Sequence, residues 1–221
     1  MSGADAISYI DNTAQSGKSY TYTVRCSYNK LVSLYDTKGL SILCLATPKI
    51  SVNGAGSVGY ATVKWNVVPG AKGYYVYRKG GSLSDYSWKR IATVSNGNTT
   101  TYVDKTATST DWRYTYTVIA YNGKNMSSYN YSGVNFDYIT APTITRAYSD
   151  TNGMRIEWKA SNTNITRYYI YRKNGANWKF IGQTTNKYYV DTTAVSGNTY
   201  TYTVKALSAT NCGGYNAKGI T

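Results

Sequence analysis

The pentapeptide Tyr-Thr-Tyr-Thr-Val occurs three times in this chain, at residues 20–24, 114–118 and 200–204. Each occurrence follows a turn that begins with an aspartate, namely Asp11, Asp104 and Asp191. The copies are separated by about 90 residues, a period that is too long for a solenoid repeat and suits one small sandwich domain. The pattern therefore predicts a tandem array of similar domains.

Other positions recur at the same spacing: Pro48 and Pro142, Trp65 and Trp158, Trp88 and Trp178, and the runs 74–79 and 168–173. We infer three copies. Residues 1–46 are the C-terminal half of a repeat, residues 47–140 are a complete domain, and residues 141–221 are a domain whose last strand is truncated. Because the first copy begins near its closing hairpin, we expect both ends to be cuts through a longer array.

Tyrosine is unusually frequent, with 26 Tyr against 2 Phe, while Pro occurs only 3 times. A composition rich in Tyr and Thr favours extended strands with polar faces. Residues alternate between two faces in the segments 60–65 and 74–79, as they do in half-buried strands. In the complete copy we predict seven strands and a core that includes Trp65, Tyr74, Val76, Tyr114, Tyr116 and Val118.

These residues resemble fibronectin type III domains as they occur in tandem arrays of Gram-positive bacterial surface and secreted proteins. The family's opening Pro, buried second-strand Trp and Gly-Tyr-x-Val-x-Arg third strand are similar to Pro48, Trp65 and residues 73–78. Its tyrosine corner falls on Tyr20, Tyr114 and Tyr200. The resemblance implies an all-β fold of tandem fibronectin type III-like, immunoglobulin-like β-sandwiches, and it says little about function.

The sequence does not predict an enzyme. It has no His, which removes the usual general base, metal ligand and triad partner. The acidic residues fall singly in separate turns, and the three recurrent aspartates are interpreted as turn anchors that accept backbone N–H bonds. Residues 54–59 match G-x-G-x-x-G but lead into a strand, so we interpret them as a flexible turn. We expect no catalytic residue, no cofactor and no metal.

Three cysteines neither make a disulfide framework nor fix the redox compartment. Cys26 and Cys44 fall on strands that pair, so a bridge between them stays open, although a free thiol also packs well at position 26. Cys212 is expected to be free and exposed. No stretch is apolar enough to span a membrane.

The net charge of +14 is spread over the copies and favours attraction to polyanions in general. There is no basic run, recognition helix or nucleic-acid motif, so a solvated surface is preferred over a dedicated polyanion site and specific nucleic-acid binding is not expected.

The outward face of two strands carries the candidate binding residues. Aromatic rings beside hydroxyl groups and cations suit stacking on sugars or anchoring a protein partner, and Thr115, Thr117, Thr201 and Thr203 are expected to lie on the same outward face. Cross-strand pairing alone also favours Tyr and Thr on exposed strands. The candidates are Tyr75, Tyr77, Lys79, Tyr86, Trp88, Tyr169, Tyr171, Lys173 and Trp178.

Two functions are therefore retained. The first is a spacer or adhesion array of an extracellular or cell-surface bacterial protein, whose signal and anchor lie outside this sequence. The alternative is a module that binds a cell-wall or host glycan, or a host protein such as immunoglobulin, for which the loops 80–87 and 122–130 are the distinctive features.

The first copy lacks the strands that would cover its core face. We predict a short strand near Ile7 to Ile10 and a hairpin around residues 20–28 and 39–46. Such a half domain leaves apolar surface and strand edges open. We therefore expect it to be ordered only by packing against residues 47–140 or by pairing with another chain.

Overall fold

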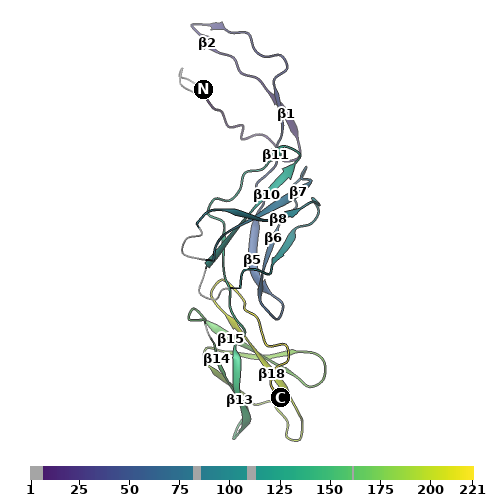
Figure 1. The fold of residues 1–221 in the computed structure, drawn as a ribbon, viewed down its shortest axis with the longest axis vertical. Coiled ribbons are helices and arrows are strands. Elements are labelled where there is room, and N and C mark those ends of the chain that lie inside the picture. The colour runs from purple at the N-terminus through teal and green to yellow at the C-terminus, as the bar shows by residue number, and fades with distance from the viewer. Residues whose placement is uncertain (1–6, 82–85, 109–112, 161) are drawn as a thin grey trace.

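The structure is a computed structural model that describes residues 7–81, 86–108, 113–160 and 162–221. All regular elements of these residues are β-strands, which run in three groups along an elongated body (Figure 1). The N-terminal segment lies at one end, and the strands nearest the C-terminus lie at the other. We call the group from β5 to β12 the second unit and the group from β13 to β18 the third unit.

The N-terminal segment contains two small antiparallel pairs. They are β1 (Ser19–Tyr22) with β4 (Leu40–Leu43), and β2 (Ser27–Tyr28) with β3 (Leu31–Val32). The strand predicted near Ile7 to Ile10 is wrong, because residues 7–10 form no strand and are exposed. The physical reason is that a strand needs a paired neighbour, and none of the described residues pairs with this stretch.

The second unit consists of two antiparallel sheets. One has the order β5 (Ile50–Ala55), β6 (Tyr60–Trp65), β9 (Thr101–Asp104). The other has the order β11 (Asn125–Met126), β10 (Arg113–Asn122), β7 (Gly73–Gly80), β8 (Lys89–Val94), and β12 (Val134–Asp137) also pairs with β10.

The third unit repeats this order. Its first sheet is β13 (Thr143–Asp150), β14 (Gly153–Lys159), β17 (Tyr188–Asp191). Its second sheet is β16 (Lys179–Thr184), β15 (Arg167–Lys173), β18 (Thr201–Leu207), and Ile220 forms a bridge to Tyr202. The predicted class, all-β with tandem fibronectin type III-like sandwiches, is confirmed by this repeated arrangement of two sheets.

Alternation along the strands places the core as predicted. All six residues of the predicted core of the second unit are buried. The ring centroids of Trp65 and Tyr74 are 5.2 Å apart, and those of Trp158 and Tyr168 are also 5.2 Å apart. One hydrophobic cluster ends at Tyr138 and the next begins at Ile139. This division lies close to the predicted boundary at residues 140–141, which stays a prediction.

In the second and third units the Asp turn forms a network that ties the two sheets together. Thr106 donates from its backbone N–H and hydroxyl group to Asp104 Oδ1, at 2.9 and 2.7 Å, so the predicted turn anchor is present. The Tyr116 hydroxyl group and Arg78 Nη1 donate to Asp104 Oδ2, at 2.9 and 2.6 Å. Burial raises the pKa of Asp104, but hydrogen bonds from Thr106 and Tyr116 outweigh it, so the net pKa is lowered.

The third unit contains the same network around Asp191. Thr193 donates to Oδ1, and Tyr202 and Arg172 donate to Oδ2 at 2.9 and 2.7 Å. In addition, Tyr200 accepts a hydrogen bond from the backbone N–H of Val195 at 3.3 Å, as expected of a tyrosine corner. The recurrent sequence therefore encodes a recurrent set of bonds and not only a recurrent strand.

The expectation that threonines of β10 and β18 lie exposed beside the candidate binding residues has to be corrected. Thr115, Thr117 and Thr203 point away from the core, as expected, but they are buried. The polypeptide that follows each strand covers them: Thr203 donates to the backbone oxygen of Asn216 at 2.8 Å, and Thr115 donates to Asn135 Oδ1 at 2.9 Å. The hydroxyl groups of Thr115 and Thr203 are therefore part of the scaffold.

All three cysteines are free, which resolves the bridge left open between Cys26 and Cys44. The Cys26 position is exposed, and the Cys44 thiol lies 3.7 Å from the backbone oxygen of Ala14. Cys212 is free as predicted but half-buried and not exposed, because it lies in the contact between the second and third units, where its backbone N–H donates to Asn53 Oδ1 at 3.1 Å.

Candidate binding site

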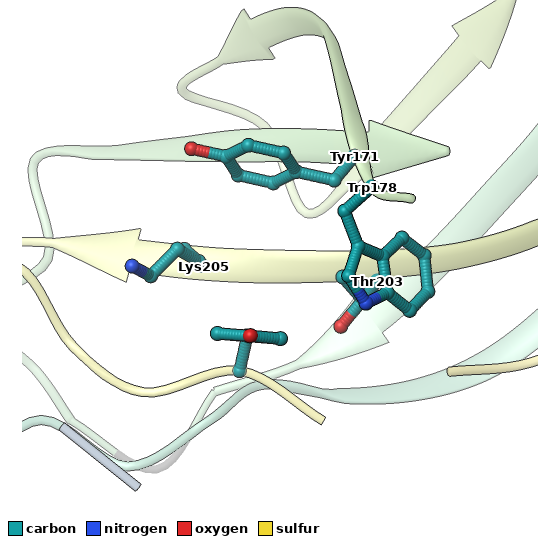
Figure 2. A pocket seen from close by; sticks show the side chains of 5 residues that line it. Tyr171, Trp178, Thr203 and Lys205 are labelled. Atoms are coloured by element: carbon teal, nitrogen blue, oxygen red, sulfur yellow. The ribbon is translucent and has the colours of Figure 1, made fainter. Parts of the chain in front are cut away.

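The predicted aromatic strand β15 lines a small pocket on the outer face of the third unit. The pocket has a volume of about 140 Å³ and is lined by Tyr171, Trp178, Thr203, Lys205 and Tyr215. Figure 2 shows the Tyr171 ring above β15, the Trp178 ring beside it, and Lys205 and Thr203 on the neighbouring strand β18. We call this the aromatic pocket.

Strand periodicity and one loop bring these residues together. Tyr171 lies on the outward side of β15, and Thr203 and Lys205 are alternate residues of β18 and therefore share a face. Trp178 immediately precedes β16, and Tyr215 comes from the chain that follows β18. The pocket thus combines aromatic faces with an ammonium group, a set that suits a sugar bearing a negative charge.

Cations lie against the aromatic rings on both sides of the pocket. Lys173 Nζ is 4.7 Å from the centre of the Trp178 ring, and Lys205 Nζ is 5.3 Å from that of Tyr215. Burial, and then the charges of Cys212 and the neighbouring tyrosines, raise the pKa of Tyr171. The Tyr171 hydroxyl group therefore stays protonated at neutral pH and can donate a hydrogen bond to a ligand.

Trp178 also has a structural contact. A side chain at Gly219 would meet the Trp178 ring, and a side chain at Gly133 would meet the ring of Trp88 in the same way. Both glycines have a positive φ, of 70° and 66°. Each tryptophan therefore covers a glycine turn between strands, and only its remaining surface is available to a ligand.

The corresponding face of the second unit is arranged differently. Strand register aligns Tyr77 and Ile119 with Tyr171 and Lys205. Trp88 and Trp178 each immediately precede the strand that pairs with β7 or β15, and Tyr129 and Tyr215 each follow the equivalent bridge by three residues. There the rings contact one another: Trp88 meets Tyr129 edge-on at 6.5 Å, and Tyr129 lies 4.2 Å from Tyr131. The replacement of Lys205 by Ile119 also removes the cation from this position.

The other predicted residues form smaller contacts. Tyr75 stacks on Tyr121 at 4.3 Å, Lys79 Nζ lies 4.6 Å from the Trp88 ring, and Tyr169 packs on Phe180 at 5.3 Å. Tyr86 is 78% exposed and forms no part of the aromatic pocket. In the loop 80–87, residues 82–85 lie outside the described residues.

The structure therefore unites Tyr171 and Trp178 in one pocket, with Lys173 against Trp178, and distributes the remaining candidates over two units. The sequence analysis missed Lys205 and Tyr215. Lys205 could have been found, because it is two residues beyond Thr203 on the same strand face. Tyr215 could not be assigned from periodicity, because it lies in an irregular segment.

A second feature outside the pocket joins the second and third units. Asn211 is buried, and its Oδ1 accepts from the backbone N–H of Gly54 at 2.7 Å and of Cys212 at 2.8 Å. Its Nδ2 donates to the backbone oxygen of Asp137 at 2.6 Å. Tyr215 N–H donates to the backbone oxygen of Ser57 at 2.7 Å. We call this set of contacts the joint.

Glycines allow the backbones of the two units to approach each other closely at the joint. A side chain on Gly54 would collide with the backbone oxygen of Cys212, and one on Gly59 would lie 2.5 Å from the backbone nitrogen of Gly214. The segment 54–59, which matches G-x-G-x-x-G, is therefore a contact surface between units. Its glycines allow two backbones to approach, and this role was not predicted.

Among the described residues, no group of three or more His, Cys, Asp or Glu is arranged to hold a metal ion. The same part of the chain contains no helix long and apolar enough to cross a membrane.

A scan against protein-family models gives no match, and no curated protein matches the sequence. Among solved structures, the chain is similar to the FN1–FN3 domains of chicken CNTN1, with 17% identity and a TM-score of 0.45, over 91% of this chain and 76% of that one. It is also similar to the chicken interferon gamma receptor alpha chain, with 11% identity and a TM-score of 0.35, over 78% and 96% of the two chains. The fold assignment rests on the strand order and register described above.

Proposed function

We propose that this chain is an extracellular spacer or adhesion segment of a bacterial surface protein, the class that its sequence resembles. The joint is the observation that supports this proposal. Buried Asn211 uses both ends of its amide group across the contact, so bending at the joint would leave buried polar groups without partners. A contact of this kind holds two units at a fixed angle.

The test is whether the second and third units tumble together. NMR relaxation should give both units the same rotational correlation time in the full chain. Asn211→Ala should separate the two values while each unit stays folded, and Asn174→Ala, an exposed residue remote from the joint, should have no effect. Independent tumbling of the units in the unaltered chain would refute a spacer with a fixed geometry.

The aromatic pocket supports a second function, the binding of a glycan that carries a carboxylate or sulfate group. Aromatic faces can stack on the sugar ring, and Lys205 can pair with the anionic group. A shallow hollow beside it, lined by Tyr169, Tyr171, Phe180, Gly182 and Gln183, could hold a further residue of the glycan.

Glycan and host-protein arrays, each probed at two salt concentrations, would test this function. A selected acidic glycan should lose binding to Trp178→Ala and to Lys205→Ile, which installs the residue found in the second unit. Trp88→Ala is the matched control and should bind normally. If the arrays select no ligand, or if Trp88→Ala has the same effect as Trp178→Ala, the pocket is not a binding site.

A further inference from the structure

The N-terminal segment has an exposed sheet face, and the equivalent face in the second unit is buried in the core. The register of β1 and β4 is the same as that of β10 and β12, so Tyr20 and Ile42 correspond to Tyr114 and Phe136. Phe136 is 1% exposed, whereas Ile42 is 47% exposed and Leu40 is 74% exposed. We call the surface formed by Tyr22, Leu40 and Ile42 of these strands, together with Val24 just beyond the end of β1, the open face.

Asp11 stands at the end of this face with most of the bonds seen in the other two networks. Thr13 donates its backbone N–H and hydroxyl group to Oδ1, at 2.8 and 2.6 Å, and Tyr22 donates to Oδ2 at 2.9 Å. These hydrogen bonds lower the pKa of Asp11, so the carboxylate is charged at neutral pH. The site is therefore assembled although the segment has only part of a sandwich.

The missing member is an arginine. Asp104 and Asp191 each accept a bond from an arginine, Arg78 or Arg172, on the strand that pairs with β10 or β18 in the opposite sheet. The same guanidinium groups lie over the rings of Tyr114 and Tyr200, at 5.2 and 4.4 Å. No basic side chain of the described residues reaches the Asp11 carboxylate or the Tyr20 ring. We call the carboxylate and the ring together the Asp11 socket.

The arginine of the segment itself is engaged elsewhere. Arg25 lies 4.2 Å from the centre of the Tyr35 ring. The segment docks on the second unit by other residues: Leu45 joins the core cluster of that unit, and Ser16 Oγ donates to the backbone oxygen of Pro69 at 3.1 Å. This docking leaves the open face and the Asp11 socket unoccupied by any described residue.

We propose that the open face binds an extended β-strand of a partner chain, antiparallel to β1, whose arginine enters the Asp11 socket. The two complete networks define the pattern of that strand. In the second unit Arg78 is opposite Tyr116, Val76 is opposite Val118, and Tyr74 is opposite Ala120. The third unit repeats the pattern with Arg172, Ile170 and Tyr168. The partner strand is therefore expected to contain the sequence Tyr-x-(Val or Ile)-x-Arg.

Charge and strand geometry both select this occupant. A charged Asp at the end of an apolar face favours a strand that ends in a cation, and arginine fits a carboxylate beside an aromatic ring better than lysine. Among the described residues β1 pairs on one side only, with β4, so its other edge can accept a strand. Strands β7 and β15 of this chain cannot serve, because they lie inside their own sheets.

Cys26 offers a reporter of the docked strand. Its counterparts Ala120 and Ala206 are buried in units that have the paired strand, opposite Tyr74 and Tyr168, whereas Cys26 is exposed. The probe is a synthetic peptide of residues 166–174, Thr-Arg-Tyr-Tyr-Ile-Tyr-Arg-Lys-Asn. Its affinity for the full chain is measured by calorimetry, and the alkylation rate of each cysteine is followed by mass spectrometry.

We expect the peptide to bind and to slow alkylation of Cys26 but not of Cys212. Asp11→Asn in the chain, or Arg172→Gln in the peptide, should weaken binding by about tenfold or more, because each removes a charge-assisted hydrogen bond. Asp36→Asn is the matched control, since Asp36 lies in an exposed turn of the same segment and accepts a bond from Lys38 N–H. It should leave the affinity unchanged.

Three outcomes would overturn the proposal. The first is the absence of Cys26 protection at about 1 mM peptide, the weak end of specific recognition. The second is binding that is indifferent to both the Asp11→Asn and Arg172→Gln changes. The third is a dimer of the chain in sedimentation that persists in Asp11→Asn and excludes the peptide, which would make a second copy the occupant.

Discussion

The hydroxyl group of Tyr116 donates a 2.9 Å hydrogen bond to Oδ2 of Asp104, 12 residues earlier in the chain. Asp104 ends strand β9 of one sheet and Tyr116 lies in β10 of the other, so this bond joins the two layers of the sandwich. The same bond joins Tyr202 to Asp191 and Tyr22 to Asp11, in each case at 2.9 Å. An arginine joins this hydrogen-bond network only in the second and third units, where strand β7 or β15 pairs with the strand that carries the tyrosine.

Arg78→Met should destabilise the second unit by about 2 kcal/mol. This is less than the loss typical of a fully buried ion pair, because Arg78 keeps some exposure while Asp104 is buried. Arg113→Met is the control: Arg113 pairs with Asp137 at 3.1 Å but is 64% exposed, so its loss should change little. Hydrogen exchange, which reports each unit separately, gives the two free energies. Equal effects would contradict the network.

Acid should destabilise both complete units through their aspartates. The folded pKa of Asp104 and of Asp191 lies below the unfolded value, which is about 3.9. Their contribution is therefore fully present above that value and is lost as the pH falls through the folded pKa.

Urea unfolding should show a loss of stability from about pH 5 downward that is smaller in Asp104→Asn. That variant should be less stable than the parent at neutral pH and should approach it in acid. Asp36→Asn should follow the parent at every pH, and the same pH dependence in all three proteins would exclude Asp104 as a cause.

Trp65→Ala should cost the second unit roughly 3–5 kcal/mol, the range for truncating a large core aromatic residue. Trp65 is buried against Tyr74, whereas Trp88 is half-buried at the outer face. Trp88→Ala should therefore cost clearly less in the same measurement. A Trp65→Ala chain as stable as the parent would be incompatible with the observed strand register.

Binding to heparin-like or nucleic-acid polymers should be weak, unselective and lost as salt rises. The positive charge is distributed over the chain and acts by screened attraction. Titrations of both polymers across a range of salt concentrations give the slope. Selective binding that resists high salt would reveal a dedicated polyanion site.

Strand patterning was accurate for the longer strands of the two complete units, but it gave seven strands for the second unit, whose described residues form eight because the short strand β11 was not predicted. The faces of β6 and β7 were assigned from alternation alone, and the predicted core residues are buried. The same reasoning failed at residues 7–10, where the pattern of a strand is present but its neighbour is absent. It also treated Thr117 and Thr203 as exposed, because periodicity gives the side of a strand and not what later folds over it.

The candidate site was predicted only in part, because periodicity gives the side of a strand and not which irregular segment lies over it. Tyr171 and Trp178 carry a visible aromatic pattern, but their union with Lys205 and Tyr215 depends on the path of an irregular segment. The boundaries at residues 46–47 and 140–141 and the assignment of binding residues stay predictions.

By itself the sequence determined the repeat, the longer strands of the two complete units and the faces of those strands, because these follow from local alternation and from recurrent residues. The tertiary structure alone decided which distant groups meet. Asn211 binds Gly54 and Asp137, and Arg78 meets Asp104, while Asp11 meets no arginine among the described residues. Such contacts depend on the placement of whole sheets and units, which short-range periodicity does not encode.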